Sequence, residues 1–401
     1  MSDISMNRWI NINYLFMIYI FCAPISKAGT SIAGGFMILL WLLSGSFKYK
    51  YEILKNSKLV VSIFLFILWS FVSLLWSDNL QFAINYLQKY WHFLLIPIII
   101  TSVDKRFMNN FFYVFILSML IVSFITFGVF LNFWSWGNVD SDNTNPFMDH
   151  TNASVYIAFA IFLTLYFVHQ DFLKKTIAYL ALIILLLGLV VSGGRSGVLY
   201  FVLTMMIIAW LKYKNLKIFA IIMVVVSIVF LIGYFQIDFF QNRINLVVVD
   251  IANLMQGNFS GGGAGARVDF WITGIKVAMD HPIIGHGVGD DAATILNHIN
   301  QSLYFDLYSK SDGLYFDYHN AFIQYFAQLG LIGLVLFLNI FYSFFQLKFD
   351  NDNLKYLSLS FLILFLCLSM GGLSMHIRGS MVLFVIFSTI FYLASINTTR
   401  R

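Results

Sequence analysis

The sequence predicts an all-α polytopic membrane protein that forms a single integral membrane domain over residues 1–401. The first observation is composition: 60% of the residues are hydrophobic and only 11% are charged, whereas a soluble domain carries about 25% charged residues. The second is a succession of apolar runs long enough to cross a bilayer. The third is the placement of most lysines and arginines in short connectors between these runs.

Twelve spans are predicted from these apolar runs, since a crossing helix needs about 20 mostly apolar residues. The fourth run is the least regular, because Asn85, Gln88, Lys89 and His92 dilute its first half. One long polar segment, 236–320, lies between the ninth and tenth runs and should hold short helices. The predicted spans are 9–26, 29–47, 59–76, 82–103, 111–133, 153–170, 175–193, 197–212, 217–235, 321–346, 356–373 and 380–397.

The basic residues predict the orientation of these spans. Sixteen of the 24 lysines and arginines lie before the first span, after the last span or in alternate connectors. Such an excess marks the cytoplasmic face, so both termini are expected there and segment 236–320 on the outer face. The net charge of +5 is explained in this way without a nucleic-acid partner.

Few cations remain for the outer face, and each is therefore informative. Arg195 lies in a glycine-rich turn, Val191–Gly197, between the seventh and eighth predicted spans. An arginine near the hydrocarbon is costly, so it either reaches lipid headgroups or binds a phosphate, which its guanidinium fork matches. The outer-face cations are Lys27, Lys89, Arg195, Arg243, Arg267, Lys276, Lys310 and Arg378.

Arg267 opens a predicted amphipathic helix within segment 236–320. The helix is expected to follow the glycine-rich run 261–266 and to stop before Pro282. Its apolar face should consist of Phe270, Trp271, Gly274, Ile275 and Ala278. A cation in the first turn opposes the helix dipole, so Arg267 is either a solvated loop residue or part of an anion site.

His319 is the best candidate for a general base on the outer face. It stands where the polar segment becomes an apolar helix, followed by Asn320, which can cap that helix. An imidazole can take a proton from a sugar hydroxyl near neutral pH. The alternative is a histidine that is merely hydrogen-bonded at a helix start.

Other motifs carry weaker signals. Gly194–Gly197 resembles the nucleophile site of rhomboid proteases, with His376 as the available histidine. Asp140 and Asp142 form a D-x-D pair that could hold a divalent metal, although solvated carboxylates are ordinary in such a loop. His281, His286 and His298 lack convincing metal-ligand spacing, so no metal site and no cofactor are expected. His150 and Asn152 could line a pocket at the start of the sixth span.

The order of four motifs resembles the O-antigen ligase family (WaaL) and the related O-antigen polymerases (Wzy). The first is the turn around Arg195, and the second is G-A-R-x-x-x-W at 265–271. The third is H-P-x-x-G-x-G at 281–287, and the fourth is H-N-x-aromatic-I at 319–323, followed by L-G-L-I-G at 329–333. The resemblance runs from about Ala153 to Gly379.

The resemblance implies a metal-independent, inverting C-type glycosyltransferase in the bacterial inner membrane, with its active site facing the periplasm. It implies that a glycan moves from undecaprenyl pyrophosphate to a sugar hydroxyl of lipid A-core. Arg195 and Arg267 match the pyrophosphate-binding arginines and His319 matches the base. Arg378, Asn320 and Tyr318 are possible secondary site residues.

Two other functions stay open at this point. A polymerase would transfer the same donor to a second undecaprenyl-linked glycan, and one large outer loop favours the ligase. A polysaccharide flippase or another transporter is a third possibility. It is disfavoured by the scarcity of charges within the predicted spans.

Overall fold

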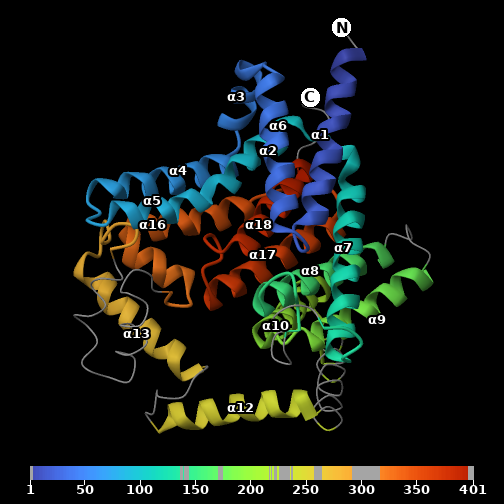
Figure 1. Ribbon diagram of the computed structural model, residues 1–401, viewed down its shortest axis with the longest axis vertical. Helices are drawn as coiled ribbons and strands as arrows, with labels where there is room; N and C mark the ends of the chain where they lie inside the picture. The colour runs from blue at the N-terminus through green and yellow to red at the C-terminus, as the bar shows by residue number, and fades with distance from the viewer. Residues whose placement is uncertain are drawn as a thin grey trace.

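The computed structural model describes residues 3–135, 139, 144–169, 175–215, 217, 219–220, 224, 235, 238–256, 264–290 and 317–395. Within these ranges the regular structure is helical, with no strand (Figure 1). The helices before the long polar segment are α1 (Asp3–Cys22), α2 (Lys27–Leu43), α3 (Phe47–Lys55), α4 (Lys58–Val72), η1 (Ser73–Leu75), α5 (Leu80–Gln88), η2 (Lys89–Leu94), α6 (Leu95–Ser102), η3 (Lys105–Phe107), α7 (Met108–Phe130), α8 (His150–His169), α9 (Lys175–Val191) and α10 (Arg195–Tyr213). Those within and after it are α12 (Asp238–Met255), α13 (Ala264–Asp280), α16 (Ala321–Phe345), α17 (Asp352–Gly371) and α18 (Arg378–Ser395).

The helical membrane class is confirmed by these elements. By length and composition, seven described helices could cross a membrane, or eight if α2 and α3, which meet at 115°, form one span. Two further apolar helices, Ile12–Cys22 and Lys175–Val191, are shorter. The ninth predicted span, 217–235, lies almost wholly outside the described residues, so the count of twelve spans stays a prediction.

The fourth predicted span differs from expectation, because interval 82–103 is divided among α5, η2 and α6. The 3₁₀ helix η2 contains Lys89 and His92, two of the polar residues that dilute this run. Pro97 lies in the first turn of α6 and has no N–H to continue a regular helix from residues before it. A six-residue 3₁₀ helix is unusually long, so this interval is a broken helix and not one straight span.

Connectors that were predicted to share a face contact one another. On the predicted cytoplasmic side, Lys58 donates to Gln346 at 3.2 Å and Lys212 donates to Asn353 at 3.3 Å. On the predicted outer side, residues 73–79 bond to residues 288–290. The packing is thus consistent with the two sets of connectors lying at opposite ends of the bundle.

The core is centred on α8 and α18. In the apolar window of α8, 83% of the residues are buried, and in that of α18 the share is 72%, whereas in α10 it is 28%. Around them, α4 and α16 pack side by side, as do α1, α2 and α7 (Figure 1). α10 is therefore a peripheral helix whose apolar surface is available to lipid.

Part of the long polar segment folds onto this bundle. The amphipathic helix predicted from Arg267 is present as α13, although it begins three residues earlier, and it packs against α16 (Figure 1). Phe270, Gly274 and Ala278 are buried as expected, but Ile275 is 47% exposed. Trp271 is only partly buried, and Val277, which was not predicted for this face, is fully buried and packs with Phe270 and Ala278.

Candidate functional site

The turn around Arg195 is held against the start of α8. Gly194 and Gly197 lie so close to Ser154 of α8 that a Cβ atom at either position would overlap its side chain. Thr144 donates to the carbonyl of Val191 at 2.5 Å, which ties the end of α9 to the segment before α8. Arg195 is the first residue of α10, and its side chain lies outside the described residues.

Arg267 of α13 lies between two other parts of the molecule. Its charge acts on the carboxylate of Asp317 and on the hydroxyl of Tyr200, in the second turn of α10. The Tyr200 hydroxyl in turn packs against Gly371 at the end of α17. The structure thus brings Arg267, the start of α10 and the segment before α16 to one place.

His319 lies at the junction between this segment and α16. Its φ of 51° is left-handed, a conformation that few residues other than glycine adopt. Its backbone N–H donates to Oδ1 of Asp317 at 2.7 Å, and Asn320 then caps α16 by accepting from the N–H groups of Phe322 and Ile323. The predicted capping role of Asn320 is confirmed.

The imidazole of His319 is accessible to solvent and lies beside Asp317 and Phe270. It is 45% exposed, and its Nδ1 lies 4.0 Å from Oδ2 of Asp317. Phe270 of α13 stacks on it at 5.7 Å between ring centroids and an angle of 23°. Since Nδ1 faces Asp317, Nε2 is the nitrogen that is available to a substrate.

Asp317 is the acid of this cluster and is only 18% exposed. Burial raises the pKa of this carboxyl above its ordinary value, while His319 and Arg267 act in the opposite direction. An ionised Asp317 can orient the imidazole and stabilise the imidazolium that forms when His319 accepts a proton. In the sequence, Asp317 and Tyr318 fill the place where the family often has a further polar residue before the His-Asn pair, but the sequence leaves the orientation of the imidazole open.

Tyr318 has a packing role between these two polar residues. It is fully buried, its ring lies against Gly274 of α13, and its N–H donates to Gln324 at 3.2 Å. Tyr318 therefore lies in the contact between α13 and α16 and fixes the position of its neighbours in the chain.

The glycine turn after α13 is joined to a break in α16. The N–H groups of His286 and Gly287 donate to the carbonyls of Ala327 and Gln328 at 3.1 and 2.9 Å, and Leu331 N–H donates to Pro282 O at 2.8 Å. Gly330 interrupts the helix there, with φ 67° and ψ −168°. The glycine turn after α13 and the break at Gly330 therefore form one backbone contact, and this contact holds α13 against α16.

The same turn reaches the connector between α4 and α5. Asp290 accepts from the N–H groups of Asp78 and Asn79 at 2.5 and 3.0 Å, just before α5 begins. Val288 N–H donates to Ser73 Oγ at 3.2 Å. The His319 cluster and the broken fourth span are thus connected through one backbone turn.

Arg378, in contrast, is in a separate group. Its Nη2 donates to the carbonyl of Lys27 at 3.3 Å, and its charge acts on Tyr19, His92 and Tyr156. Neither contact involves the His319 cluster, so the structure does not place Arg378 beside the candidate base.

The residues of the weaker sequence motifs do not lie in the His319 cluster as far as the structure describes them. Ser196 interacts with Tyr200, and His376 contacts Lys89 at 2.9 Å, so the pairing that a rhomboid-like protease requires is not formed. His281 and His286 meet edge to face at 4.6 Å, and in the described part of the chain no three His, Cys, Asp or Glu residues gather as metal ligands. Asp140, Asp142 and His298 lie outside the described residues.

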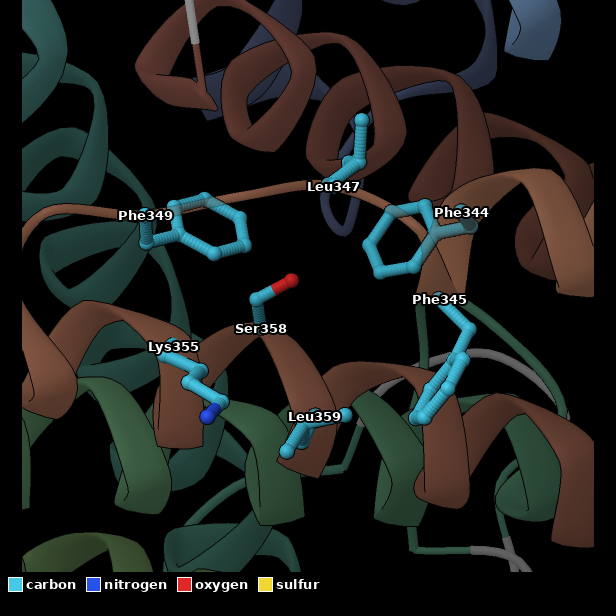
Figure 2. A pocket seen from close by; sticks show the side chains of 7 residues that line it. All are labelled: Phe344, Phe345, Leu347, Phe349, Lys355, Ser358 and Leu359. Atoms are coloured by element: carbon cyan, nitrogen blue, oxygen red, sulfur yellow. The ribbon is translucent and has the colours of Figure 1, made fainter.

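One small cavity lies far from this chemistry. It is about 70 Å³ in volume and lies between the end of α16 and the start of α17, lined mainly by apolar side chains together with Lys355 and Ser358 (Figure 2). The 25 residues of α16 separate it from His319, a helix length of roughly 35 Å. Its lining contains no histidine or carboxylate, so the His319 cluster is the better candidate site.

The fold and the cluster together define a polytopic helical membrane protein with an Arg–Asp–His group at the edge of its bundle. Residues 180–338 match the Wzy_C family model, described as O-antigen ligase, which confirms the family resemblance over this segment. Members of this family are glycosyltransferase-like enzymes that act on lipid-linked glycans. The matched segment contains Arg195, Arg267 and His319 but not Arg378.

The chain is also similar to a protein of Haemophilus influenzae that is described as uncharacterized. The two are 24% identical over 214 residues, which is 51% of this chain and 53% of the relative. The chain therefore matches about half the length of this relative.

Proposed function

We propose that this protein is an O-antigen ligase of the bacterial inner membrane, with its active site at the periplasmic face. It transfers a glycan from undecaprenyl pyrophosphate to a sugar hydroxyl of lipid A-core, with inversion at the anomeric carbon. The observation that carries the proposal is the convergence of Arg267, Asp317 and His319, with the imidazole supported by Phe270 and open to solvent.

In this mechanism His319 is the general base. Its neutral Nε2 accepts the proton of the acceptor hydroxyl while that oxygen bonds to the anomeric carbon, and Asp317 stabilises the resulting imidazolium. The bond between the anomeric carbon and the pyrophosphate oxygen breaks on the opposite face of the sugar. The electron pair leaves on the pyrophosphate.

Arg195 and Arg267 are proposed to bind that leaving group. Preorganised guanidinium groups stabilise the charge that grows on a phosphate oxygen, and they do so without a metal. The position of Arg195 at the first residue of α10 adds the partial positive charge of a helix N-terminus. Tyr200, one turn later, is within reach of the Arg267 charge, which supports a common site for the two arginines.

The test compares donor affinity and single-turnover transfer in three variants of purified protein. Arg195→Lys and Arg267→Lys should weaken donor binding as well as transfer, because a point charge does not reproduce the bidentate fork. His319→Ala should bind donor normally and transfer roughly 10²–10⁴-fold more slowly, as expected for a lost base.

Matched controls come from the same segment. Lys276→Gln removes an exposed charge of α13, and His281→Ala removes an exposed histidine after it; both should transfer at the wild-type rate. Wild-type transfer by His319→Ala would refute the assignment of the base. Equal loss of donor binding in all three test variants would make His319 a donor ligand.

The acceptor separates ligase from polymerase. Transfer to lipid A-core supports the ligase, whereas transfer only to a second undecaprenyl-linked glycan supports the polymerase. Translocation of the lipid-linked glycan without any transfer would identify a transporter. Transfer should also persist in excess EDTA and after Asp140→Ala with Asp142→Ala, and loss that magnesium restores would favour a D-x-D metal enzyme instead.

A further inference from the structure

A row of exposed apolar side chains runs along one side of α13 and continues into the turn after it. Ile272, Ile275 and Met279 are three and four residues apart, which places them on one side of an α-helix. Ile283 and Ile284 follow in the turn, and each of the five side chains is at least 40% exposed. These five side chains are named the outer stripe. Because α13 is not among the helices that could cross a membrane, the outer stripe marks an interaction surface.

The rest of α13 gives this helix two further sides. Phe270 and Val277 are buried in the contact with α16. Asp269, Lys276 and Asp280 are spaced by seven and four residues, which places them on another side, and Lys276 and Asp280 are exposed. One side of α13 therefore meets protein, one is polar and exposed, and one is apolar and exposed. Such a division is typical of a helix that lies where protein, water and hydrocarbon meet.

The outer stripe is continuous with an exposed apolar side of α16. The N–H groups of Leu331 and Ile332 donate to the carbonyls of Pro282 and Ile283 at 2.8 and 3.3 Å, so the turn after α13 lies directly against α16. Leu331 and Val335, one helical turn apart, are exposed on a helix that could cross a membrane. In such a helix, exposed apolar side chains meet lipid. The apolar surface thus passes from a candidate span onto α13, which lies beside α16 (Figure 1).

Lipid fits the outer stripe better than a second copy of this chain does. Five side chains fall well short of the roughly 20–30 residues that each partner contributes to a standard protein interface. The stripe also adjoins the exposed side of a candidate span, where the hydrocarbon of the bilayer is the expected neighbour.

We propose that α13 lies in the surface of the bilayer, with the outer stripe in contact with the acyl chains of phospholipids. The leaflet is the one on its own side of the protein, which the basic residues predict to be the outer leaflet. Helices of this kind insert their apolar side roughly 5–10 Å into the boundary between headgroups and acyl chains. Lys276 and Asp280 then face water, and the contact requires no particular headgroup, because all five side chains of the outer stripe are apolar.

This contact sets the level of the His319 cluster relative to the bilayer. Phe270 of α13 stacks on His319, and the charge of Arg267, in the same helix, acts on Asp317. These polar groups are therefore held near the headgroups, within reach of molecules whose apolar chains stay in the hydrocarbon. The contact of α13 with lipid does not itself depend on the reaction at His319.

The test measures the surroundings of single nitroxide labels on the full chain in vesicles of phosphatidylethanolamine and phosphatidylglycerol. The two native cysteines are replaced by serine, and one new cysteine is introduced and labelled in each variant. Ile275→Cys and Met279→Cys place the label in the outer stripe. Lys276→Cys and Asp280→Cys are the matched controls, because each is the next residue in the chain but lies on the polar side of α13. Val335→Cys on α16 is the reference for contact with lipid.

Two collision rates are compared for each label. Molecular oxygen concentrates in hydrocarbon, whereas a neutral nickel chelate stays in water. The ratio of oxygen to nickel collisions should be several-fold higher for Ile275→Cys and Met279→Cys than for Lys276→Cys and Asp280→Cys, and it should approach the ratio for Val335→Cys. All five positions are exposed, and two positions on each side of α13 keep the test valid if one variant does not fold.

A high ratio in the outer stripe without any added donor supports the contact with phospholipid. Nickel collisions as frequent as those of Lys276→Cys and Asp280→Cys would place the stripe in water and overturn the proposal. Protection from both reagents would also overturn it. Spectral broadening that disappears on dilution with unlabelled protein would then identify a second copy as the partner, and its absence would mean that this chain covers the stripe itself.

One further outcome concerns the donor. A ratio that rises only after undecaprenyl pyrophosphate is added would assign the outer stripe to the apolar chain of that molecule and overturn the contact with phospholipid. None of these outcomes alters the assignment of His319, which the transfer assay tests separately.

Discussion

Asp317 bonds to the backbone of His319, 2.7 Å from Oδ1 to the amide nitrogen, and its other oxygen lies 4.0 Å from the imidazole Nδ1. The main-chain bond holds His319 in its left-handed conformation, and the carboxylate faces one side of the ring. The acid therefore fixes the backbone of His319 and also lies beside its imidazole.

Replacing Asp317 should impair transfer more than donor binding. Asp317→Asn keeps an oxygen for the His319 N–H but removes the negative charge that stabilises an imidazolium. Transfer should slow roughly tenfold or more, since two unit charges 4.0 Å apart attract each other by about 1–4 kcal/mol near a protein surface. Single-turnover rates with saturating donor measure this effect. A wild-type rate in Asp317→Asn would leave the carboxylate with a structural role only.

The same variant should show the opposite effect on stability. Burial raises the pKa of Asp317, so the folded protein binds this proton more tightly than the unfolded chain does. Stability is then lost as pH rises from the ordinary aspartate pKa, about 3.9, through the raised folded value. In detergent at pH 7.5, Asp317→Asn should unfold at the wild-type temperature or above it, and the difference should vanish near pH 3.5. An unfolding temperature of Asp317→Asn that falls progressively below that of the wild type as pH rises would contradict this sign.

Two asparagine N-caps allow the effect of a lost cap on stability to be distinguished from its effect on transfer. Asn320 caps α16 beside His319, and Asn351 caps α17 with the same pair of backbone bonds at the other end of the bundle. Asn320→Ala and Asn351→Ala should each cost about 1 kcal/mol. Only Asn320→Ala should reduce transfer, because it releases the segment that carries the base. Thermal unfolding and transfer assays on both variants give the comparison, and equal transfer in the two would mean that the cap does not position His319.

Gly330 should not tolerate a side chain. Its φ of 67° and ψ of −168° lie in a region that is essentially restricted to glycine, and a Cβ atom would overlap the carbonyl of Ile283. Gly330→Ala should therefore cost about 1–3 kcal/mol and loosen α13 from α16. Gly35→Ala is the control, because that glycine lies within α2 with no neighbour within 4 Å and alanine favours a helix. Unfolding temperatures that fall equally in both variants would contradict the strain at Gly330.

The orientation of the chain can be tested by labelling. Single cysteines at Asp280 and Asn351, both exposed, are introduced after Cys22 and Cys367 are replaced by serine. A membrane-impermeant thiol reagent should label Cys at 280 in intact spheroplasts but reach Cys at 351 only after lysis. Labelling at 351 in intact cells would move His319 to the cytoplasmic side and overturn the proposed function.

Some features of the site could be predicted from local sequence because their causes are local. Asn320 caps α16 as its place before an apolar run predicts, and the segment that was predicted to stop before Pro282 forms the helix Ala264–Asp280. The partners of His319 were harder to predict. Phe270 stacks on His319, and Arg267 acts on Asp317, from a helix about 50 positions earlier. The spacing of apolar residues predicts which face of this helix is buried, but it does not show that the face packs beside His319.

The sequence by itself determined the class of this protein, since 60% hydrophobic residues and long apolar runs leave a helical bundle in lipid as the stable solution. It also determined the family match and the positions of Arg195, Arg267 and His319. Only the tertiary structure decided that Asp317 faces His319, that the turn at Gly285 joins the break at Gly330, and that Lys89 meets His376 across 287 positions. Hydropathy and helical spacing describe a residue together with its near neighbours in the chain, whereas these contacts depend on how distant helices pack, which is a property of the whole fold.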